Sequence, residues 1–150
     1  MDIQIRQGIK SDLSAALALI KELAEFERAL DQVTNTLEEM EEDGFGSSPI
    51  FNFFVAEQAR EIIGLSLYYY RYSTWKGKRL YLEDIIVTES FRGQGIGKML
   101  LEKTIEKARE EKCTGMRWQV LDWNESAIKF YEKYNSNFDS GWVNCNIDFD

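Results

Sequence analysis

Three segments that each have the character of a β-strand follow one another in the middle of the chain, with turns of only a few residues between them. They span residues 51–58, 62–72 and 80–87, and the last is rich in isoleucine, leucine and valine. Turns this short join antiparallel neighbours, because parallel strands need a crossover of a dozen or more residues. The pattern therefore predicts an antiparallel meander at the centre of the fold.

Segments with helical spacing lie on both sides of this meander. Apolar residues recur at helical intervals over residues 13–26 and 96–108, and Thr36 with Glu39 forms a capping box for a short helix. We expect one domain over residues 1–150, of α+β class, with a mixed, mostly antiparallel central sheet and helices on both faces. The remaining elements expected are strands at residues 3–9, 116–121 and 142–149 and a helix at 124–133.

The composition excludes several classes of function. The chain has no histidine, and its two cysteines, Cys113 and Cys145, form no CxxC pair, so zinc and haem sites lack their usual ligands and we expect no metal. A net charge of −8 disfavours binding to nucleic acid or anionic membranes. The apolar stretches are too short to cross a bilayer, and no secretory leader is visible. We therefore expect a cytoplasmic protein with free thiols and with neither nucleic acid nor membrane as a partner.

A glycine-rich loop joins the third strand of the meander to the helix that begins near residue 96. Glycines allow backbone N–H groups to approach a ligand closely, and the helix N-terminus adds positive potential, so a pyrophosphate is the expected guest. The loop lacks the third glycine of the dinucleotide fingerprint and the spacing of the P-loop. It reads Arg92, Gly93, Gln94, Gly95, Ile96, Gly97 and Lys98, and its two cations would add charge for an anion.

With this loop the chain resembles the Gcn5-related N-acetyltransferase superfamily, whose pantetheine-pyrophosphate loop reads Arg/Gln-x-x-Gly-x-Gly/Ala. Arg92, Gly95 and Gly97 match it, and residues 81–87 look like the strand that holds the thioester. The order of elements agrees from residue 3 to residue 147. Within the superfamily, the chain most resembles the diamine (spermidine/spermine) and thialysine N-acetyltransferases. That resemblance is carried by residues 21–27, 43–46, 72–78, 81–84 and 123–125.

The resemblance implies transfer of an acetyl group from acetyl-CoA, as co-substrate, to a small primary amine such as a polyamine or a lysine-like molecule. It implies Glu83 as the general base and Tyr131 as the general acid that protonates the leaving thiolate. The residues expected to bind the cofactor are Ile85, Ile86, Val87, Arg92, Gly93, Gln94, Gly95, Ile96, Gly97, Lys98 and Asn124. The residues expected near the amine are Phe26, Glu27, Trp75, Glu83 and Asp84.

The spacing of these residues makes further predictions. Strand alternation places Glu83 and Ile85 on one face of the sheet and Asp84 on the other, and Asp84 becomes the competing base if the register shifts by one. Asn124 and Tyr131 are seven residues apart, so they share one face of the last helix. The backbone N–H groups around Ile86 and Val87 are expected to bind the acetyl oxygen.

Two other functions stay open on the sequence. The acceptor could be a protein or antibiotic amine, or the chain could be an acyl-CoA-binding sensor without activity, although a sensor needs neither Glu83 nor Tyr131. Phe26 stands where the resembled enzymes often have a tyrosine, which leaves the identity of the amine open. A homodimer is also expected, because the three consecutive tyrosines at residues 68–70 and the expected strand around Trp142 offer aromatic surface. The resembled family is also dimeric.

Overall fold

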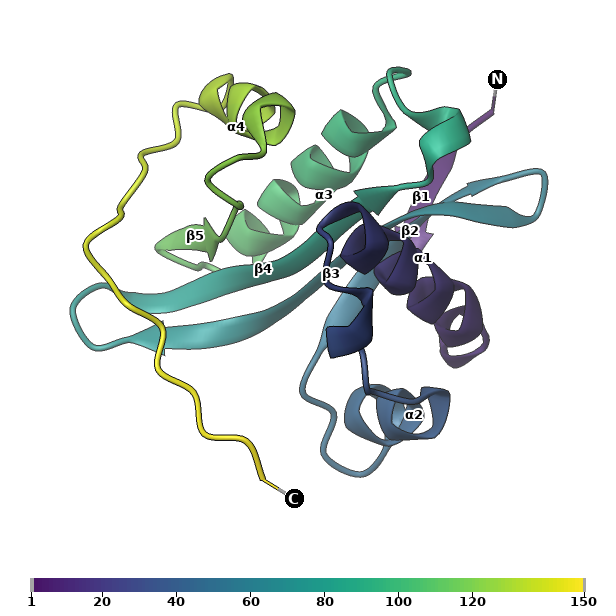
Figure 1. The fold of residues 1–150 in the computed structure, drawn as a ribbon, viewed down its shortest axis with the longest axis horizontal. Coiled ribbons are helices and arrows are strands. Elements are labelled where there is room, and N and C mark those ends of the chain that lie inside the picture. The colour runs from purple at the N-terminus through teal and green to yellow at the C-terminus, as the bar shows by residue number, and fades with distance from the viewer. Residues whose placement is uncertain (1, 150) are drawn as a thin grey trace. The chain divides into compact units, whose positions relative to one another are not determined.

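The computed structural model describes residues 2–149. The chain forms two compact units, Met1–Gln119 and Val120–Asp150. The first unit contains the sheet together with helices α1, α2 and α3, and the second contains helix α4 (Figure 1). None of the helices in residues 2–149 is long and apolar enough to cross a membrane.

Within residues 2–149, five strands form one sheet in the order β1-β2-β3-β4-β5. The pairings from β1 to β4 are antiparallel, and β5 joins β4 in parallel, so the predicted meander and the mostly antiparallel sheet are confirmed (Figure 1). The two-residue turn between β2 and β3 uses positive φ at Ala59 and Arg60, as tight hairpins require. The strands are β1 Gln4–Gln7, β2 Asn52–Gln58, β3 Glu61–Ser73, β4 Gly77–Val87 and β5 Gly115–Trp118.

The helices begin and end close to the predicted positions. They are α1 Leu13–Phe26, α2 Leu37–Phe45, α3 Ile96–Glu110 and α4 Glu125–Glu132. Half of the predicted capping box is present, since the Thr36 hydroxyl accepts a hydrogen bond from the Glu39 N–H at 3.1 Å. The Thr36 N–H donates to the Asn35 side chain at 3.0 Å and not to Glu39, so the reciprocal bond is absent. Short 3₁₀ turns, Lys10–Asp12, Leu30–Gln32 and Glu89–Phe91, complete the connections.

Helices cover both faces of the sheet, as predicted. On one face, α1 and α2 bury apolar side chains against β2, β3 and β4. On the other face, α3 packs on the same strands, and a buried hydrogen bond of 2.6 Å joins Ser66 to Thr104. Burial of apolar surface on both sides provides the main driving force for folding. The core beneath α1 and α2 consists of Leu13, Ala16, Leu19, Met40, Phe53, Val55, Leu65, Leu67 and Ile86.

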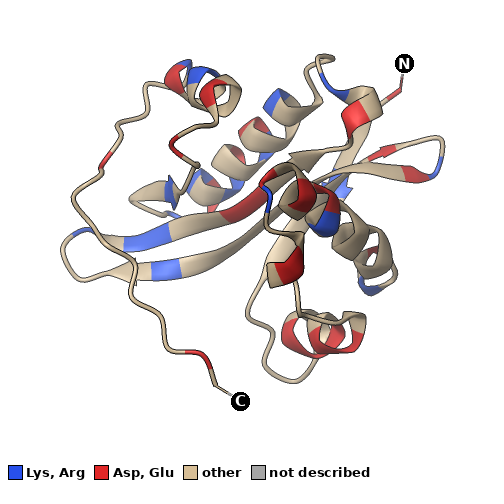
Figure 2. Ribbon diagram, viewed as in Figure 1, with Lys and Arg blue, Asp and Glu red and all other residues tan. Residues whose placement is uncertain are grey.

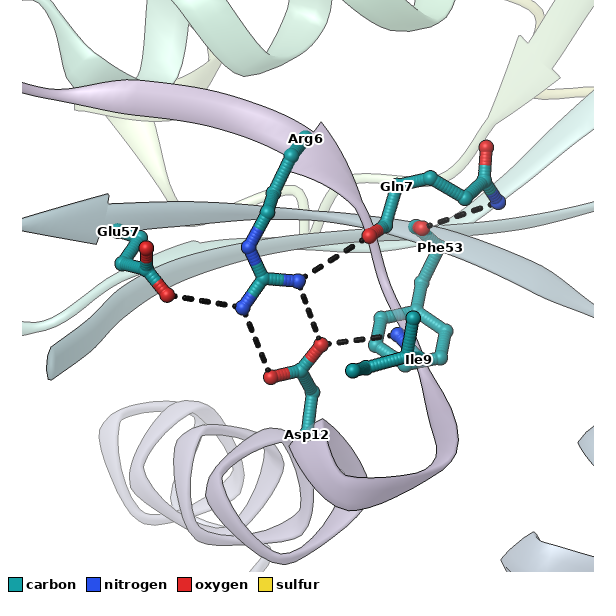
Figure 3. Close-up of polar contacts among 6 residues, drawn as sticks. All are labelled: Arg6, Gln7, Ile9, Asp12, Phe53 and Glu57. Atoms are coloured by element: carbon teal, nitrogen blue, oxygen red, sulfur yellow. Dashed lines mark hydrogen bonds and ion pairs between the residues drawn. The ribbon is translucent and has the colours of Figure 1, made fainter. Parts of the chain in front are cut away.

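A cluster of ionic contacts holds β1, β2 and the start of α1 together (Figure 3). The Arg6 guanidinium donates to both oxygens of Asp12, at 2.8 and 3.0 Å, and to Glu57 at 2.9 Å. Asp12 is buried and also accepts the Ile9 N–H at 2.8 Å. The hydrogen bonds from Arg6 hold the pKa of Asp12 below its usual value. This bidentate contact between Arg6 and Asp12 fixes the position at which α1 begins.

The strand predicted at residues 142–149 is wrong. These residues form no strand, and their apolar side chains Val143, Ile147 and Phe149 are exposed. Alternation of apolar and polar residues describes a strand only when a neighbouring strand pairs its backbone groups. The predicted strand at 116–121 is present but shorter, because β5 ends at Trp118.

Candidate functional site

The ladder between β3 and β4 contains a bulge at Glu83. Leu67 pairs with Asp84 and Tyr68 pairs with Leu82, so Glu83 stands opposite no residue of β3. An extra residue of this kind interrupts the alternation of side chains along a strand and redirects them locally. The bulge therefore decides where the acidic pair of β4 points.

Both acidic side chains lie on the face of the sheet that carries α1. Asp84 stands opposite Leu67, which belongs to the core beneath α1. Glu83 accepts a hydrogen bond from the Tyr69 hydroxyl at 3.0 Å, and Tyr69 shares the Leu67 face because the two are two residues apart on β3. Ile85, next along β4, faces the other side. The prediction that Glu83 shares a face with Ile85 and not with Asp84 is therefore wrong, since it assumed a ladder without a bulge.

Asp84 is the residue with the most perturbed acidity in this group. Burial, followed by the nearby charges of Glu83 and Glu27, raises the pKa of Asp84 to about 7. Burial also raises the pKa of Glu27, the C-cap residue of α1. Figure 2 shows acidic residues in the middle of β4. Carboxyl groups that repel one another in a half-buried setting stabilise a cation placed among them.

Tyr69 is a member of this group that the sequence analysis did not single out. Its ring stacks on Tyr81 with centroids 5.3 Å apart, which directs its hydroxyl along the sheet toward Glu83. Burial and the charge of Glu83 raise the pKa of Tyr69 to about 12, so the hydroxyl remains a donor at neutral pH. No local pattern marks this tyrosine, because its contact with Glu83 depends on the register of two strands.

The edge of β4 is open from the bulge onward. The parallel ladder with β5 ends where Leu82 pairs with Trp118. The Thr88 N–H donates to the Ile63 carbonyl of β3, and alternation then directs the Ile86 N–H to β3 as well. The N–H groups of Ile85 and Val87 consequently face the open edge. Of the two N–H groups predicted to meet an acetyl oxygen, that of Val87 faces the open edge and that of Ile86 faces β3.

The glycine-rich loop has the geometry of an anion cradle. Gly93 and Gly95 adopt positive φ values of 78° and 83°, and a Cβ added at either residue would meet no atom within 4 Å. Gly95 is also the N-cap of α3 and supplies no side chain to the N–H groups of its first turn. Open space, unshielded N–H groups and the positive end of the helix dipole together fit a pyrophosphate.

The two cations of the loop have partners within the protein. Arg92 donates from Nε to the Val87 carbonyl at 2.9 Å and from Nη2 to Glu22 at 3.4 Å. Lys98 is exposed and lies 4.0 Å from Glu102 on α3. Arg92 thus forms an ion pair with Glu22, which balances part of its charge within the protein.

The residues predicted near the amine fall into two places in the first unit. Glu27, Glu83 and Asp84 act on one another electrostatically, and the ring of Phe26 lies 5.5 Å from the Arg92 guanidinium. Trp75 instead lies in the exposed turn between β3 and β4. On β3, Ser73 pairs with Gly77 beside this turn, and Leu67 pairs with Asp84. These two pairs are six residues apart on β3, which corresponds to about 20 Å along the strand. Within one chain, Trp75 is thus remote from the carboxylates.

Asn124 and Tyr131 belong to the second unit. Asn124 is the N-cap of α4, and its side-chain oxygen accepts the Ala127 N–H at 3.3 Å. Tyr131 is buried in the last turn of α4, with its ring 5.4 Å from that of Phe130. The sequence therefore placed both residues correctly on one helix.

A cavity of about 420 Å³ lies in another part of the first unit, and none of the predicted site residues borders it. Its walls include Phe45, Phe51, Tyr68, Lys107 and Glu111. No group of three or more His, Cys, Asp or Glu side chains is arranged to hold a metal ion within residues 2–149.

Comparison with known proteins identifies the family. The model of the acetyltransferase (GNAT) family matches residues 17–135. Thialysine N-epsilon-acetyltransferase of Bos taurus is 42% identical over 138 residues, covering 87% of this chain and 81% of that protein. Spermidine/spermine N(1)-acetyltransferase-like protein 1 of Homo sapiens is 35% identical over 149 residues, covering 93% of this chain and 21% of that protein.

A solved structure confirms the fold. An aminoglycoside acetyltransferase from an uncultured soil metagenomic sample superposes with a TM-score of 0.79 at 19% identity, covering 99% of this chain and 97% of that one. The family match and the curated relatives confirm the resemblance inferred from the loop and from residues 81–87. The chain therefore belongs to the acetyltransferase (GNAT) family, and it is an acetyltransferase.

Proposed function

We propose that this acetyltransferase transfers an acetyl group from acetyl-CoA to a primary amine of a small polyamine or a lysine-like molecule such as thialysine. The observation that carries the proposal is the group formed by Glu27, Glu83 and Asp84, in which burial and then mutual repulsion raise the pKa of Asp84 to about 7. A cationic amine relieves that repulsion, whereas a neutral or anionic acceptor does not. The names of the relatives from Bos taurus and Homo sapiens agree with such an acceptor.

The glycine loop is the proposed cofactor site. Acetyl-CoA, when bound, supplies the activated thioester, and the loop would hold its pyrophosphate. The positive φ values of Gly93 and Gly95 and the open space around both support this assignment. The Ile85 and Val87 N–H groups on the open edge of β4 are the proposed donors to pantetheine and the acetyl oxygen. The other residues proposed to contact the cofactor are Ile86, Arg92, Gln94, Ile96, Gly97, Lys98 and Asn124.

Glu83 is the proposed general base. A free alkyl ammonium has a pKa of about 10.4, so almost none of it is nucleophilic at neutral pH until a base removes the proton. Glu83 is exposed, sits at the bulge where β4 leaves β5, and is held by Tyr69. Asp84 remains the competing base, since a pKa near 7 suits proton transfer at neutral pH.

Tyr131 is the proposed general acid, and Asn124 the proposed contact to the cofactor from the same helix. Both roles require the two compact units to act as one acetyltransferase domain over residues 1–150. The span of the family model, residues 17–135, supports this, because it runs across the division between the units. We propose no metal for this reaction, because thioester aminolysis needs only a base, an acid and an oxyanion site.

We further propose a cytoplasmic homodimer. The aromatic surface available for self-association is at Tyr70, Tyr72 and Trp75, all exposed, and also at Trp142. The expectation that Tyr68 adds to this surface is wrong, because Tyr68 is fully buried. Both cysteines are free, which suits a reducing compartment. Light scattering at micromolar concentration is expected to give twice the chain mass, and a monomer would contradict the dimer.

The experiment that tests the function combines binding with turnover. Acetyl-CoA is expected to raise the unfolding temperature, and mass spectrometry should then detect acetylated product from spermidine or thialysine. A peptide with a free amine and an aminoglycoside serve as comparison acceptors, and we expect much slower acetylation of both. Binding of acetyl-CoA without product from any amine would contradict the proposal and favour the acyl-CoA sensor.

A further inference from the structure

We propose that Glu22 is a positioning residue that organises the cofactor loop from outside it. This inference rests on the proposed binding of acetyl-CoA at residues 93–98. Glu22 lies on α1, and the loop begins after β4, so the two are remote in sequence and meet only in the folded chain. Both oxygens of the Glu22 carboxylate are occupied by donors from the segment that leads into the loop.

The contacts of Glu22 span the whole link between β4 and the glycines. Oε1 accepts from the Thr88 hydroxyl at 2.8 Å. Oε2 accepts from the Glu89 N–H at 3.0 Å and from Nη2 of Arg92 at 3.4 Å. One carboxylate thus receives a hydroxyl, a backbone amide and a guanidinium. Hydrogen bonds to a charged acceptor are stronger than neutral ones and restrict the donors to one arrangement.

Arg92 transmits this restraint to the two backbone segments that would contact the cofactor. Its Nε donates to the Val87 carbonyl at 2.9 Å, so the peptide that follows Val87 is fixed at the open edge of β4. Its guanidinium also lies 5.5 Å from the ring centre of Phe26, one turn beyond Glu22 on α1. Arg92 itself contacts Glu22, Val87 and Phe26. Gly93 follows Arg92 directly, so the glycine loop begins next to a residue whose position is fixed.

The charge balance explains why an acidic residue is tolerated beside an anion site. A carboxylate close to a bound pyrophosphate would repel it, but Glu22 shares its charge with the Arg92 guanidinium at 3.4 Å. The pair leaves the N–H groups of the loop and of the α3 N-terminus as the attractive elements. Glu22 therefore contributes by ordering the loop before the ligand arrives, which lowers the entropic cost of binding.

The test compares two glutamates on the same helix. Glu22→Ala removes the restraint, while Glu25→Ala makes the same chemical change at an exposed residue of the same helix. Calorimetry with acetyl-CoA should show about tenfold or greater weakening for Glu22→Ala, the effect of one lost charge-assisted hydrogen bond, and less than about twofold for Glu25→Ala. In steady-state kinetics the KM for acetyl-CoA should rise by a similar factor, while the KM for the amine changes little.

Two further variants separate positioning from a simple loss of stability. Glu22→Gln keeps an oxygen acceptor and should recover part of the affinity. Thr88→Val removes one donor, and its effect should shrink when combined with Glu22→Ala, because both changes remove the same hydrogen bond. If Glu22→Ala does not fold, Glu22→Gln and Thr88→Val carry the test, each expected to weaken acetyl-CoA binding by a few-fold.

The outcomes are distinct. If Glu22→Ala lowers the unfolding temperature of the free protein but binds acetyl-CoA as the wild type does, Glu22 is only a structural tie and the inference is wrong. Equal losses in Glu22→Ala and Glu25→Ala would overturn it as well. Failure of the wild-type protein to bind acetyl-CoA would instead refute the proposed function, and the inference with it.

Discussion

The Tyr69 hydroxyl donates a hydrogen bond to the Glu83 carboxylate at 3.0 Å, next to the bulge at which the register between β3 and β4 shifts. Glu83 has no partner of its own in the ladder, so this contact is what orients its side chain. Tyr69 in turn stacks on Tyr81, two residues before Glu83 on β4. The proposed base is thus held by an aromatic pair rather than by strand alternation.

Tyr69→Phe removes this hydrogen bond while keeping the stacked ring. The carboxylate of Glu83 then samples other rotamers, so we expect kcat to fall by about threefold to tenfold, the effect of one lost hydrogen bond. Affinity for acetyl-CoA should not change. Tyr72→Phe, on the exposed end of the same strand, serves as the matched control. Steady-state rates at saturating acetyl-CoA provide the measurement, and equal rates for the two variants would show that Tyr69 does not position the base.

Asp84→Asn should stabilise the fold at alkaline pH. The native pKa of Asp84 is raised to about 7, whereas an unfolded aspartate titrates near 3.9. The folded state therefore binds the proton more tightly, and the stability of the wild type falls as pH rises from about 4 through about 7. The variant escapes this loss, so its unfolding temperature should exceed that of the wild type at pH 8 and match it at pH 4. A difference independent of pH would contradict the assigned acidity.

Asp12→Asn should weaken the fold in the opposite pH range. The hydrogen bonds from Arg6 lower the pKa of Asp12, so the ion pair stabilises the native state above the usual aspartate pKa and is lost as pH falls through the lowered value. At pH 7 we expect a loss of about 1–3 kcal/mol in denaturant unfolding. Asp43→Asn, at an exposed residue of α2, is the control and should change little. Equal stabilities of the two variants would show that the contact in Figure 3 is energetically minor.

Gly95→Asp tests the anion cradle. The substitution adds a carboxylate in the open space beside the first turn of α3 and strains a residue with a φ of 83°. We expect acetyl-CoA binding to weaken by at least about tenfold in calorimetry, since the new carboxylate would repel the pyrophosphate at close range. Gly141→Asp, in the exposed segment of the second unit, controls for added charge. Unchanged affinity in Gly95→Asp would place the cofactor elsewhere.

Local patterns in the sequence were sufficient for much of this account. The glycine loop and the helix after it could be predicted because backbone freedom at Gly93 and Gly95 and the apolar spacing of α3 are local properties. The meander could be predicted because short turns allow only antiparallel neighbours. The placement of Asn124 and Tyr131 on α4 followed from helical spacing alone.

Features that depend on contacts between distant segments could not be predicted. The bulge at Glu83 arises from the pairing of β3 with β4, so counting along β4 gave the wrong face. The partners of Glu22 are 66 to 70 residues away, and nothing in either segment marks them. The prediction of a strand at residues 142–149 was wrong for the same reason, because alternation of apolar and polar residues does not show whether a partner strand is present.

The choice between Glu83 and Asp84 as the base is the most direct question about the mechanism. The bulge brings both carboxylates to one face, so geometry alone permits either. They differ in exposure, with Glu83 reaching solvent and Asp84 half-buried among the other carboxylates. A base that receives a proton from the amine and passes it to water needs the exposed position, which favours Glu83.

The central claim is tested most directly by the pH dependence of kcat in Glu83→Gln, measured beside Asp84→Asn and Tyr131→Phe. General-base assistance contributes about 10²–10⁴-fold, so Glu83→Gln should lose that much at neutral pH with acetyl-CoA affinity unchanged. Raising the pH should restore part of the loss, because more of the amine is then neutral. Tyr131→Phe should lose rate without that recovery. Near-normal turnover by Glu83→Gln together with inactivity of Asp84→Asn would make Asp84 the base, and full activity of both variants would refute catalysis through this strand.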